Sequence, residues 1–585
     1  MRTCRAGVAR PVEDRGEERP SEAAAAARRF DDDILYPCRR RAFGSRNDEL
    51  RGNHAQHASV RVPRDEDGSV TLARDQKAQA LALPRRIGLE IALDREKIAQ
   101  EFAERRYLVR ARAVDAHPIR QHPKALFLHG KVVNSFWARI HAVEPAVNVP
   151  RLTTALSGPL PELERAILGA SPAIEHWLRG QWQEHESPFY CSVDLRNSGF
   201  KLAPVDTNLF PGGFNNLNAD FHPLCVQAAM TALEKVCPDA RGAVLIPENH
   251  TRNQFYLQNI KTLQKILRHA GMTVRIGSLL PEITKATDVE LPGGGKLTLE
   301  PLRRKGNRLV VGDFDPCVVL LNNDLSAGIP EILREVEQSL LPPLQAGWAV
   351  RRKSNHFAAY RDVAEEFAAL VGIDPWLVNP YFERCGRIDF RERKGEECLE
   401  GYVTEILDEM RAKYREYSID AEPFVIVKAD AGTYGMGIMT VKDPAEVRGL
   451  NRKQRNKMAV VKEGLQVQDV IVQEGVYTFE TVEDAVAEPV VYMIDHYVVG
   501  GFYRVHTERG KDENLNAPGM HFAPLAFAAP CSSPDPDDPG CPPNRFYAYG
   551  VVARLALLAA AIELERTADV LHAADPADSA ATAAG

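Results

Sequence analysis

Residues 190–216, YCSVDLRNSGFKLAPVDTNLFPGGFNN, are the stretch around which the rest of the chain is organised. Their pattern predicts two antiparallel strands joined by a tight turn at 197–199. Because side chains alternate between the faces of a strand, Asp206 and Asn208 should point the same way, and Asp194 can reach that face from the partner strand. Carboxylate and amide oxygens are ligands suited to Mg²⁺. The stretch therefore predicts a metal-binding hairpin, with an exposed hairpin carrying solvated acids as the alternative.

Pro211, Gly212 and Gly213 directly follow the second predicted strand. Glycine has no Cβ, so the backbone here can come close to whatever the metal holds. We therefore expect Gly212 and Gly213 to contact a substrate.

Length and composition limit the possible functions. At 585 residues, with 44% apolar and 26% charged residues, the chain is long enough for about two to four domains of ordinary globular composition. A net charge of -7 argues against a nucleic-acid partner. The most apolar run, Val551–Leu558, is shorter than the roughly 20 residues that span a bilayer and contains Arg554, so no membrane partner is expected. The start lacks an export pattern and the ten cysteines lack a C-x-x-C pair, so we expect a reduced, cytoplasmic protein.

The chain before the hairpin divides into two parts. Residues 1–80 provide little apolar surface to bury, so we expect a poorly ordered extension. Residues 81–184 have apolar residues at helical spacing, interrupted by prolines, which predicts a helical flank. The last of its helices is expected over Pro161–Gln183, with a break or kink at Pro172.

From residue 221 to residue 345 short apolar strands alternate with helices. Strands are expected over Gly242–Pro247, Met272–Gly277 and Val318–Asn323, and helices over Arg252–Ala270 and Pro330–Leu340. This alternation predicts a small, largely parallel sheet covered on both faces. Ligands meet the carboxyl ends of such strands, where Asn249 and Asn323 stand. Both are therefore candidate substrate contacts, with a loop or helix cap as the alternative.

The sharpest local signal is Phe424–Thr440, FVIVKADAGTYGMGIMT. Two predicted strands flank a loop that contains Gly432, Gly435 and Gly437. Glycines free backbone N–H groups to wrap phosphate oxygens, and Lys428 at the strand end adds a positive charge. Since a strand rather than a helix follows, this is neither a Walker A loop nor a dinucleotide-binding turn. We expect a phosphate-binding lid between antiparallel strands, with a plain hairpin loop as the alternative.

Further segments extend the predicted nucleotide site. A strand at 470–472 ends in Gln473-Glu474-Gly475-Val476, which offers backbone groups and an acid suited to adenine and ribose. Arg504 follows a predicted strand pair and is a natural partner for a carboxylate or a transferring phosphoryl group. Lys353 precedes a predicted helix at 361–370 and is a candidate phosphate contact, with a surface cation as the alternative.

The lysine strand, the glycine loop, the Gln-Glu-Gly-Val segment, Val-Val-Gly-Gly, Arg504 and an Asn-Leu pair together resemble the ATP-grasp ligases. In those ligases an Asp and an acid-x-Asn-x-x-Pro-Gly signature normally follow the Asn-Leu pair. Here the signature stands much earlier, at Asp194, Asp206, Asn208 and Pro211-Gly212. The order looks circularly permuted, as in the glutathione synthetases of eukaryotes.

The hairpin stretch, GWAVRRKSNHF and VKADAGTYGMGIMTV look like the proteobacterial glutamate–cysteine ligase family, over roughly residues 120–530. The resemblance implies a ligase of glutathione biosynthesis that uses ATP and Mg²⁺. It would join the γ-carboxylate of glutamate to the amine of cysteine through an acyl phosphate. Alternatives are another ATP-grasp carboxylate–amine ligase, such as glutathione synthetase, or a non-catalytic nucleotide-binding protein.

The roles that follow from the motifs and the resemblance cover four groups of residues. The metal ligands would be Asp194, Asp206 and Asn208. The catalytic residues would be Arg504 and Lys428, and the ATP contacts Lys353, Lys428, Gly432, Thr433, Gly435, Gly437, Gln473, Glu474 and Val476. The substrate contacts would be Arg504, Asn514, Asn516, Gly212, Gly213, Asn249 and Asn323.

The expected fold class is α/β, of the α+β kind: a circularly permuted ATP-grasp fold with a small parallel α/β domain and a helical N-terminal flank. The expected parts are an extension (1–80), the helical flank (81–184), the metal hairpin (185–220), the small α/β domain (221–345), the nucleotide-binding domain (346–530), and a linker, C-terminal helix and disordered tail (531–585).

Overall fold

The computed structural model describes residues 158–249, 253–292, 294–432, 437–459, 466–524 and 545–569. All of them belong to one of two compact units, residues 122–585. The extension expected at 1–80 and most of the expected helical flank lie outside the described residues, as do Thr433 and Gly435 of the predicted lid.

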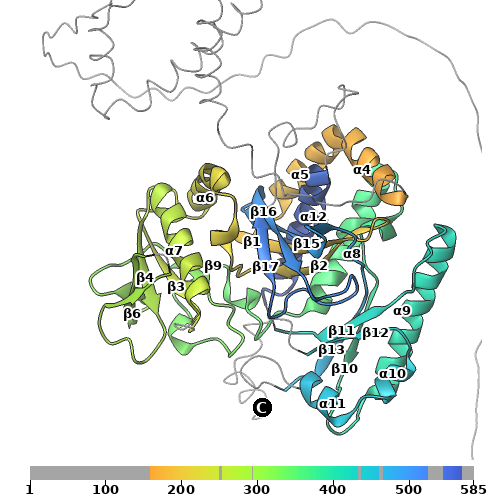
Figure 1. Ribbon diagram of the computed structural model, residues 1–585. Helices are drawn as coiled ribbons and strands as arrows, with labels where there is room; N and C mark the ends of the chain where they lie inside the picture. Colours follow the sequence, from red (N-terminus) through yellow and green to blue (C-terminus); the bar gives the residue numbers. More distant parts are fainter. Residues whose placement is uncertain are drawn as a thin grey trace, which may run out of the picture. The chain divides into compact units, whose positions relative to one another are not determined.

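A six-stranded sheet contains the predicted metal hairpin (Figure 1). Its order is β17-β16-β15-β1-β2, with β14 beside β15. The strands are β1 (Tyr190–Asn197), β2 (Leu202–Asn208), β14 (Thr481–Val482), β15 (Ala485–Ile494), β16 (Tyr497–His506) and β17 (His521–Pro524). Strand β1 pairs antiparallel with β15, so that Asp194 lies opposite Val490. The hairpin therefore adds to strands from the far end of the chain.

A four-stranded antiparallel sheet carries the lysine strand and the glycine loop. Its order is β10 (Phe382–Gly386), β13 (Asp469–Glu474), β11 (Val425–Ala429) and β12 (Ile438–Val441). Helix α9 (Glu396–Glu416) packs along it, and α10 (Ala445–Arg448) and α11 (Arg452–Met458) lie beyond β12 in sequence. A Cβ at Gly475 would lie 2.2 Å from the Phe424 ring, so only glycine fits at this crossing of β13 with β11. The predicted antiparallel pair around the loop is confirmed.

The small α/β region forms a seven-stranded sheet, ordered β5-β6-β4-β3-β8-β9 with β7 beside β6. The strands are β3 (Gly242–Pro247), β4 (Thr273–Ser278), β5 (Thr287–Glu290), β6 (Lys296–Lys305), β7 (Arg308–Val311), β8 (Val318–Asn322) and β9 (Ser339–Leu341). Strand β3 runs parallel to β4 and β8, as predicted. Alternate residues of β3 belong to two different hydrophobic clusters, and one of these clusters contains side chains of α6 (His222–Val236) and α7 (Gln254–His269). Both faces of the sheet are thus buried at its central strand β3.

The helix predicted over Pro330–Leu340 is wrong. The segment forms a 3-10 turn at Glu331–Leu333 and then strand β9, whose Ser339 pairs with Val318 of β8. The Gln338 side chain exchanges hydrogen bonds with the backbone of Leu309, at 2.8 and 2.7 Å. Pairing with distant strands therefore overrides the local helical pattern of this segment.

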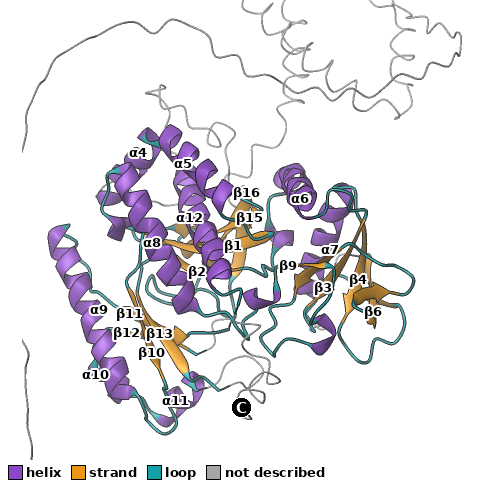
Figure 2. Cartoon of the chain, turned by 180° about the vertical axis from the view of Figure 1, so that it is seen from behind, coloured by secondary structure: helices purple, strands orange, loops and turns teal. Residues whose placement is uncertain are grey.

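Helices α4 (Pro159–Gly169), α5 (Ser171–Glu184), α8 (Lys353–Val371) and α12 (Arg545–Arg566) gather beside the hairpin strands (Figure 2). The predicted break near Pro172 falls at Ala170, between α4 and α5. Helix α8 begins at Lys353, earlier than the predicted start at residue 361. The expected C-terminal helix is α12, which packs against α8, β1 and β2.

Helix α12 contains the apolar run Val551–Leu558, which is shorter than a bilayer span in the sequence but lies within a longer helix in the structure. It is the one helix among the described residues that is long and apolar enough to cross a bilayer, with a mean hydropathy of 1.5 over its most apolar window. Yet 83% of this most apolar stretch is buried inside the protein, and core helices of soluble proteins can be equally long and apolar. Its apolar surface is accounted for by packing.

Candidate active site

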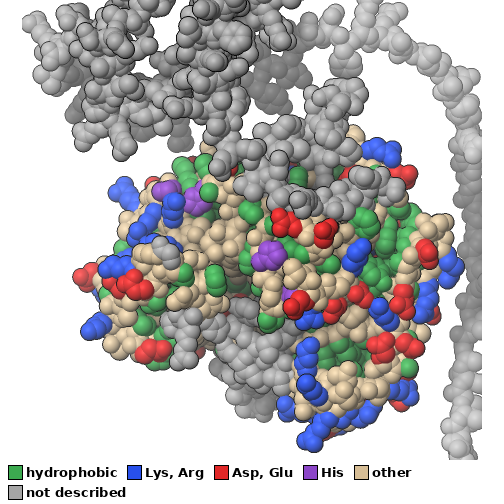
Figure 3. Space-filling view, viewed as in Figure 1, with side chains coloured by type: hydrophobic (Ala, Val, Ile, Leu, Met, Phe, Trp, Pro, Cys, Tyr) green, Lys and Arg blue, Asp and Glu red, His purple; other side chains and the backbone are tan. Residues whose placement is uncertain are grey.

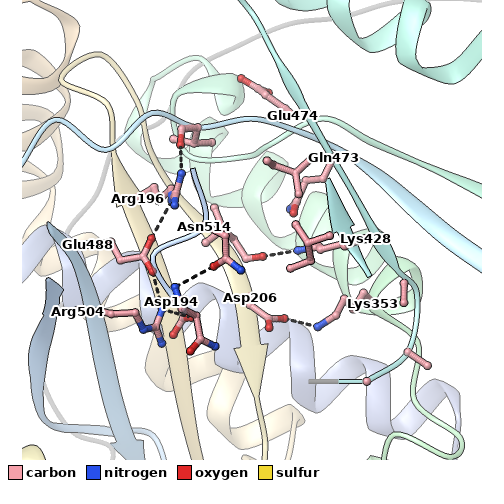
Figure 4. A pocket seen from close by; sticks show the side chains of 18 residues that line it. Asp194, Arg196, Asp206, Lys353, Lys428, Gln473, Glu474, Glu488, Arg504 and Asn514 are labelled. Carbon is pink, nitrogen blue, oxygen red and sulfur yellow. Dashed lines mark hydrogen bonds and ion pairs between the residues drawn. The ribbon is translucent and has the colours of Figure 1, made fainter. Parts of the chain in front are cut away.

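A pocket lies where the hairpin strands β1 and β2 face the lysine strand β11, strand β13 and the end of β16 (Figure 4). It encloses about 830 Å³ of empty space, part of it open to solvent. It collects eleven of the predicted site residues: Asp194, Asp206, Lys353, Lys428, Gly432, Gln473, Glu474, Val476, Arg504, Asn514 and Asn516.

Asp194 and Asp206 are direct cross-strand partners in the β1–β2 ladder. Two carboxylates opposite each other repel unless cations compensate. Here Lys353 Nζ lies 2.6 Å from Asp206 Oδ1, and Arg504 Nη1 lies 2.8 Å from Asp194 Oδ2. Burial by itself raises the pKa of Asp206, but the charges of Lys353 and Lys428 hold this pKa below its ordinary value. Asp206 is therefore ionised at neutral pH.

Lys428 reaches the same face from β11. Its ammonium donates to the carbonyl oxygen of Val205 at 2.6 Å, directly before Asp206 in the chain. Its side chain is buried, and this burial lowers the pKa of Lys428 to about 7, although the Asp206 charge opposes the shift. A phosphate group placed here would restore the charged form of Lys428.

Lys353 is held by the first turn of α8 and the end of β11. Its backbone N–H donates to the carbonyl of Asp430 at 2.7 Å. The fully buried Asp430 carboxylate accepts from the N–H and from the hydroxyl of Ser354, each at 2.8 Å. The carboxylate of Asp430, which directly follows β11, thus caps the N-terminus of α8. Asp430 was not singled out from the sequence, although it stands two residues after Lys428.

Glu488 and Arg196 are two pocket residues that the sequence reasoning missed. Glu488 accepts from Arg504 Nη1 at 2.5 Å and from Arg196 Nε at 2.9 Å. Burial alone raises the pKa of Glu488, but the charges of Arg196 and Arg504 keep this pKa below its ordinary value. Arg196 lies two residues after Asp194 on the same strand, a spacing that could have indicated a shared face. Glu488 is placed by its pairing with Arg504 across β15 and β16, which no local pattern reveals.

Gln473 and Glu474 differ in how free their side chains are. The Glu474 carboxylate turns away from the two aspartates and accepts from Lys201 Nζ at 2.8 Å and from Trp376 Nε1 at 3.1 Å (Figure 4). The buried Nε2 of Gln473 has no hydrogen-bond partner among the described residues. The side chain of Gln473 therefore offers a donor to a bound group, whereas that of Glu474 is already engaged by the protein.

The structure separates six predicted site residues from this pocket: Asn208, Gly212, Gly213, Gly437, Asn249 and Asn323. Asn208 Oδ1 accepts from the N–H of Phe210 at 2.9 Å. The phenol of Tyr492 donates to the carbonyl of Gly212, and a Cβ at Gly213, where φ is 96°, would lie 2.8 Å from that phenol oxygen. The glycines thus serve contacts within the protein.

Asn249 and Asn323 lie together in a second pocket, at the carboxyl ends of β3 and β8. The side chain of Asn323 also makes local bonds, donating to Pro247 O at 3.3 Å and accepting from the N–H of Leu325 at 3.0 Å. Strand-end placement of both residues is confirmed, and their role as substrate contacts stays a prediction.

Charged side chains on the face shown in Figure 3 intermingle, with Lys and Arg beside Asp and Glu. Nucleic-acid-binding surfaces gather basic side chains on one face. The expected absence of a nucleic-acid partner stays a prediction.

Comparison with known proteins gives a strong structural match. A protein of Methylobacillus flagellatus KT, whose name of gamma-glutamylcysteine synthetase is a provisional assignment, is 69% identical, with a TM-score of 0.67. The match covers 72% of this chain and 99% of the other. A search of curated proteins found no match.

Two further solved structures are only weakly similar. A glutathione synthetase like-effector of Globodera pallida is 9% identical with a TM-score of 0.30, over 62% of this chain and 80% of the other. D-alanyl-alanine synthetase A of Vibrio cholerae is 10% identical with a TM-score of 0.28, over 54% of this chain and 81% of the other.

The model of the GshA family, glutamate-cysteine ligase, matches residues 164–564 and so spans the three sheets, α8 and most of α12. The chain belongs to the glutamate-cysteine ligase family and is an ATP-dependent ligase.

Proposed function

We propose that the pocket between the β1–β2 hairpin and β11 is the active site, in which ATP phosphorylates the γ-carboxylate of glutamate and the amine of cysteine attacks the acyl phosphate. The observation that carries this proposal is the meeting of the hairpin carboxylates with Lys353, Lys428 and Arg504 in one pocket. Formation of an acyl phosphate needs charge neutralisation and positioning more than a protein nucleophile.

The donor set suits Mg²⁺ in part. Asp194 and Asp206 supply two opposed carboxylates on one face, and no cluster of three His, Cys, Asp or Glu side chains fit for a metal occurs in the described ranges. Mg²⁺ is commonly held by one or two carboxylates, with substrate phosphates and water completing its shell. Asp194 and Asp206 would hold the ion, and Asn208 stays a predicted ligand. When bound, Mg²⁺ would offset the negative charge of the reacting phosphates.

The cationic side chains would act on the phosphates and carboxylates of the reactants. Lys428 and Lys353 would contact ATP phosphates, and Arg504 would stabilise the charge that develops at the transferred phosphoryl group. The free donor of Gln473 would bind the nucleotide base edge. The water-excluding lid predicted at 432–437 falls largely on residues 433–436, which lie outside the described residues, and it stays a prediction.

A circularly permuted ATP-grasp arrangement is part of this proposal. Its support is the order of the parts along the chain: the carboxylates stand on β1 and β2, ahead of the lysine strand β11 and of β15, to which β1 pairs. We also propose a cytoplasmic location, in keeping with the six unpaired cysteines of the described residues.

Release of ADP by the purified full chain tests the function directly. Glutamate and cysteine supplied together with ATP and Mg²⁺ should give sustained ADP release, and each amino acid alone should give little. Release that instead needs γ-glutamylcysteine and glycine would identify a glutathione synthetase. No release with any amino acid pair, from protein that binds ATP, would identify a non-catalytic nucleotide-binding protein.

A further inference from the structure

Helix α12 comes after every element that lines the active-site pocket, yet it packs directly behind that pocket. It contacts β1 and β2, which carry the two aspartates, and α8, which begins with Lys353. Figure 2 shows α12 beside α8 and the hairpin strands. Most of the helix is apolar, so a buried charge on it needs a specific partner.

Glu563 is that buried charge, and its partner is Arg351. Glu563 is 2% exposed and Arg351 is 3% exposed. Arg351 Nε lies 3.0 Å from Glu563 Oε1, and Arg351 Nη2 lies 3.0 Å from Glu563 Oε2. This two-point geometry fixes the plane of the guanidinium.

The remaining arm of Arg351 points to the hairpin. Its Nη1 donates to the carbonyl oxygen of Thr207 at 2.7 Å. Thr207 stands between Asp206 and Asn208, the two predicted metal ligands of β2. The guanidinium thus restrains the backbone that carries the Asp206 carboxylate.

The other oxygen contact of Glu563 reaches α8. His356 Nδ1 lies 3.1 Å from Glu563 Oε2. An ionised carboxylate can only accept hydrogen bonds, so His356 Nδ1 carries the proton and donates the hydrogen bond to Glu563. His356 lies three residues after Lys353, at the start of α8. The ammonium of Lys353 lies 2.6 Å from the carboxylate of Asp206. The Glu563 carboxylate therefore restrains both partners of the Lys353–Asp206 pair. It acts on Asp206 through Arg351 and on Lys353 through His356.

From this geometry we infer that Glu563 and Arg351 are positioning residues of the ligase site, which hold the Asp206 backbone and the start of α8 in the arrangement that binds metal and phosphate. The inference rests on the proposed function of the pocket. It makes the C-terminal helix a working part of the active site, although the helix lines none of the pocket.

Three variants of the full chain test it: Glu563→Gln, Arg351→Met, and the two combined. Each single variant should weaken metal binding by about 10-fold or more, because supporting groups behind metal ligands have effects of that size. Mn²⁺ binding in the presence of ADP, followed by electron paramagnetic resonance, and the Mg²⁺ dependence of turnover give two readouts. The KM for glutamate should change by less than about twofold, because the network touches the metal hairpin and not the other substrate contacts.

The double variant separates positioning from general stability. Removing both members of a buried ion pair leaves no unpaired charge, so its thermal midpoint should lie nearer to that of the wild type than the midpoint of either single variant. Metal binding should stay weak, because nothing holds the Thr207 carbonyl. Recovery of Mn²⁺ affinity together with stability would show that the network only supports the fold, and would overturn the inference.

Glu175→Gln is the matched control, because it removes an ion pair that joins α5 to the same helix, α12. Glu175 pairs with Arg554 of α12 at 2.7 Å, on the side that faces α5. This variant should keep the Mn²⁺ affinity and turnover of the wild type. Wild-type protein without glutamate- and cysteine-dependent ADP release would refute the proposed function, whereas normal metal binding in Glu563→Gln and Arg351→Met would refute the positioning role alone.

Discussion

At the scale of single residues, burial changes the pKa of the Lys428 ammonium. Its ammonium is enclosed near two other cations, Lys353 and Arg196, and two carboxylates, Asp206 and Asp194. Burial disfavours the charged form, and the carboxylates only partly offset this effect. A bound phosphate would supply the missing negative charge.

Replacing Lys428 with alanine should slow turnover or weaken ATP binding by about a hundredfold, since one charge contact in a closed site contributes on the order of 3 kcal/mol. The fold should survive, as judged by circular dichroism. Lys265→Ala, which removes an exposed lysine of α7, is the control and should behave as wild type. A folded Lys428→Ala protein with wild-type turnover would contradict the assignment of the nucleotide site.

The low pKa of Lys428 predicts a pH dependence of nucleotide binding. In the ligand-free protein this pKa is about 7, below its ordinary value of 10.5, so above neutral pH the group must take up a proton when phosphate binds. The dissociation constant for ATP should therefore rise with pH above about 7, by at most about tenfold per pH unit. Titration with a fluorescent nucleotide analogue would measure this. Lys428→Arg should flatten the profile, because guanidinium does not titrate in this range.

Asp206→Asn removes the charge of one proposed metal ligand while keeping nearly the same shape. Mg²⁺-dependent turnover should fall by about a hundredfold or more, since a metal ligand and the partner of Lys353 are lost together. Folding should be largely spared, and Mn²⁺ binding measures the ligand role directly. Asp220→Asn, at an exposed position, is the control. Unchanged Mn²⁺ affinity in Asp206→Asn would show that Asp206 is not a ligand.

At the scale of elements, a buried ion pair joins the β1–β2 hairpin to the four-stranded sheet. Lys201, in the connection between β1 and β2, lies 2.8 Å from Glu474 at the end of β13, and both side chains are 1% exposed. Burial lowers the pKa of Lys201 to about 8, although the Glu474 charge opposes this shift. The acid that the sequence suggests for the ribose is thus a link between two sheets.

Glu474→Gln should lower the free energy of unfolding by about 3 kcal/mol, because it leaves Lys201 buried without a counter-charge. Urea unfolding measures the change. The double variant Lys201→Met with Glu474→Gln should recover part of the loss, since no unpaired charge remains and the glutamine can still accept from Trp376. Asp288→Asn, in an exposed ion pair with Lys296, should leave the unfolding midpoint unchanged.

At the scale of the whole molecule, the parts of the site come from distant regions of the chain. The hairpin supplies carboxylates, β11 and α8 supply lysines, and β16 supplies Arg504. The match to the family model begins at residue 164, and the Methylobacillus protein corresponds to 72% of this chain. Residues 1–163 thus lie outside the part of the chain that the family model matches.

Deletion of residues 1–80 should leave the melting temperature and ADP release nearly unchanged, because a segment that buries little contributes little stability. Differential scanning calorimetry and the two-substrate ADP assay measure the two effects. A large fall in either would show that this region packs against the ligase or takes part in the reaction.

Sequence by itself determined the local pieces of this protein. The lysine strand, the glycine loop and the hairpin with Asp194 and Asp206 are each encoded within a few residues, by strand alternation and by glycine. Their residue types alone predict phosphate and metal binding, without information on tertiary contacts. The parallel strands β3 and β8 could also be predicted from the sequence. A strand buried on both faces is a short continuous run of apolar residues, which is visible in the local sequence.

Only the tertiary structure decided which of these pieces meet. In place of the helix expected at Pro330–Leu340 there is a 3-10 turn and the short strand β9, which pairs with β8. The side chain of Asn208 bonds within its own loop. Glu488 and Glu563 entered the site or its support through partners across strands and helices, Arg504 and Arg351. Such contacts depend on chain closure over hundreds of residues, and no local periodicity records them, because burial and pairing are properties of the folded whole.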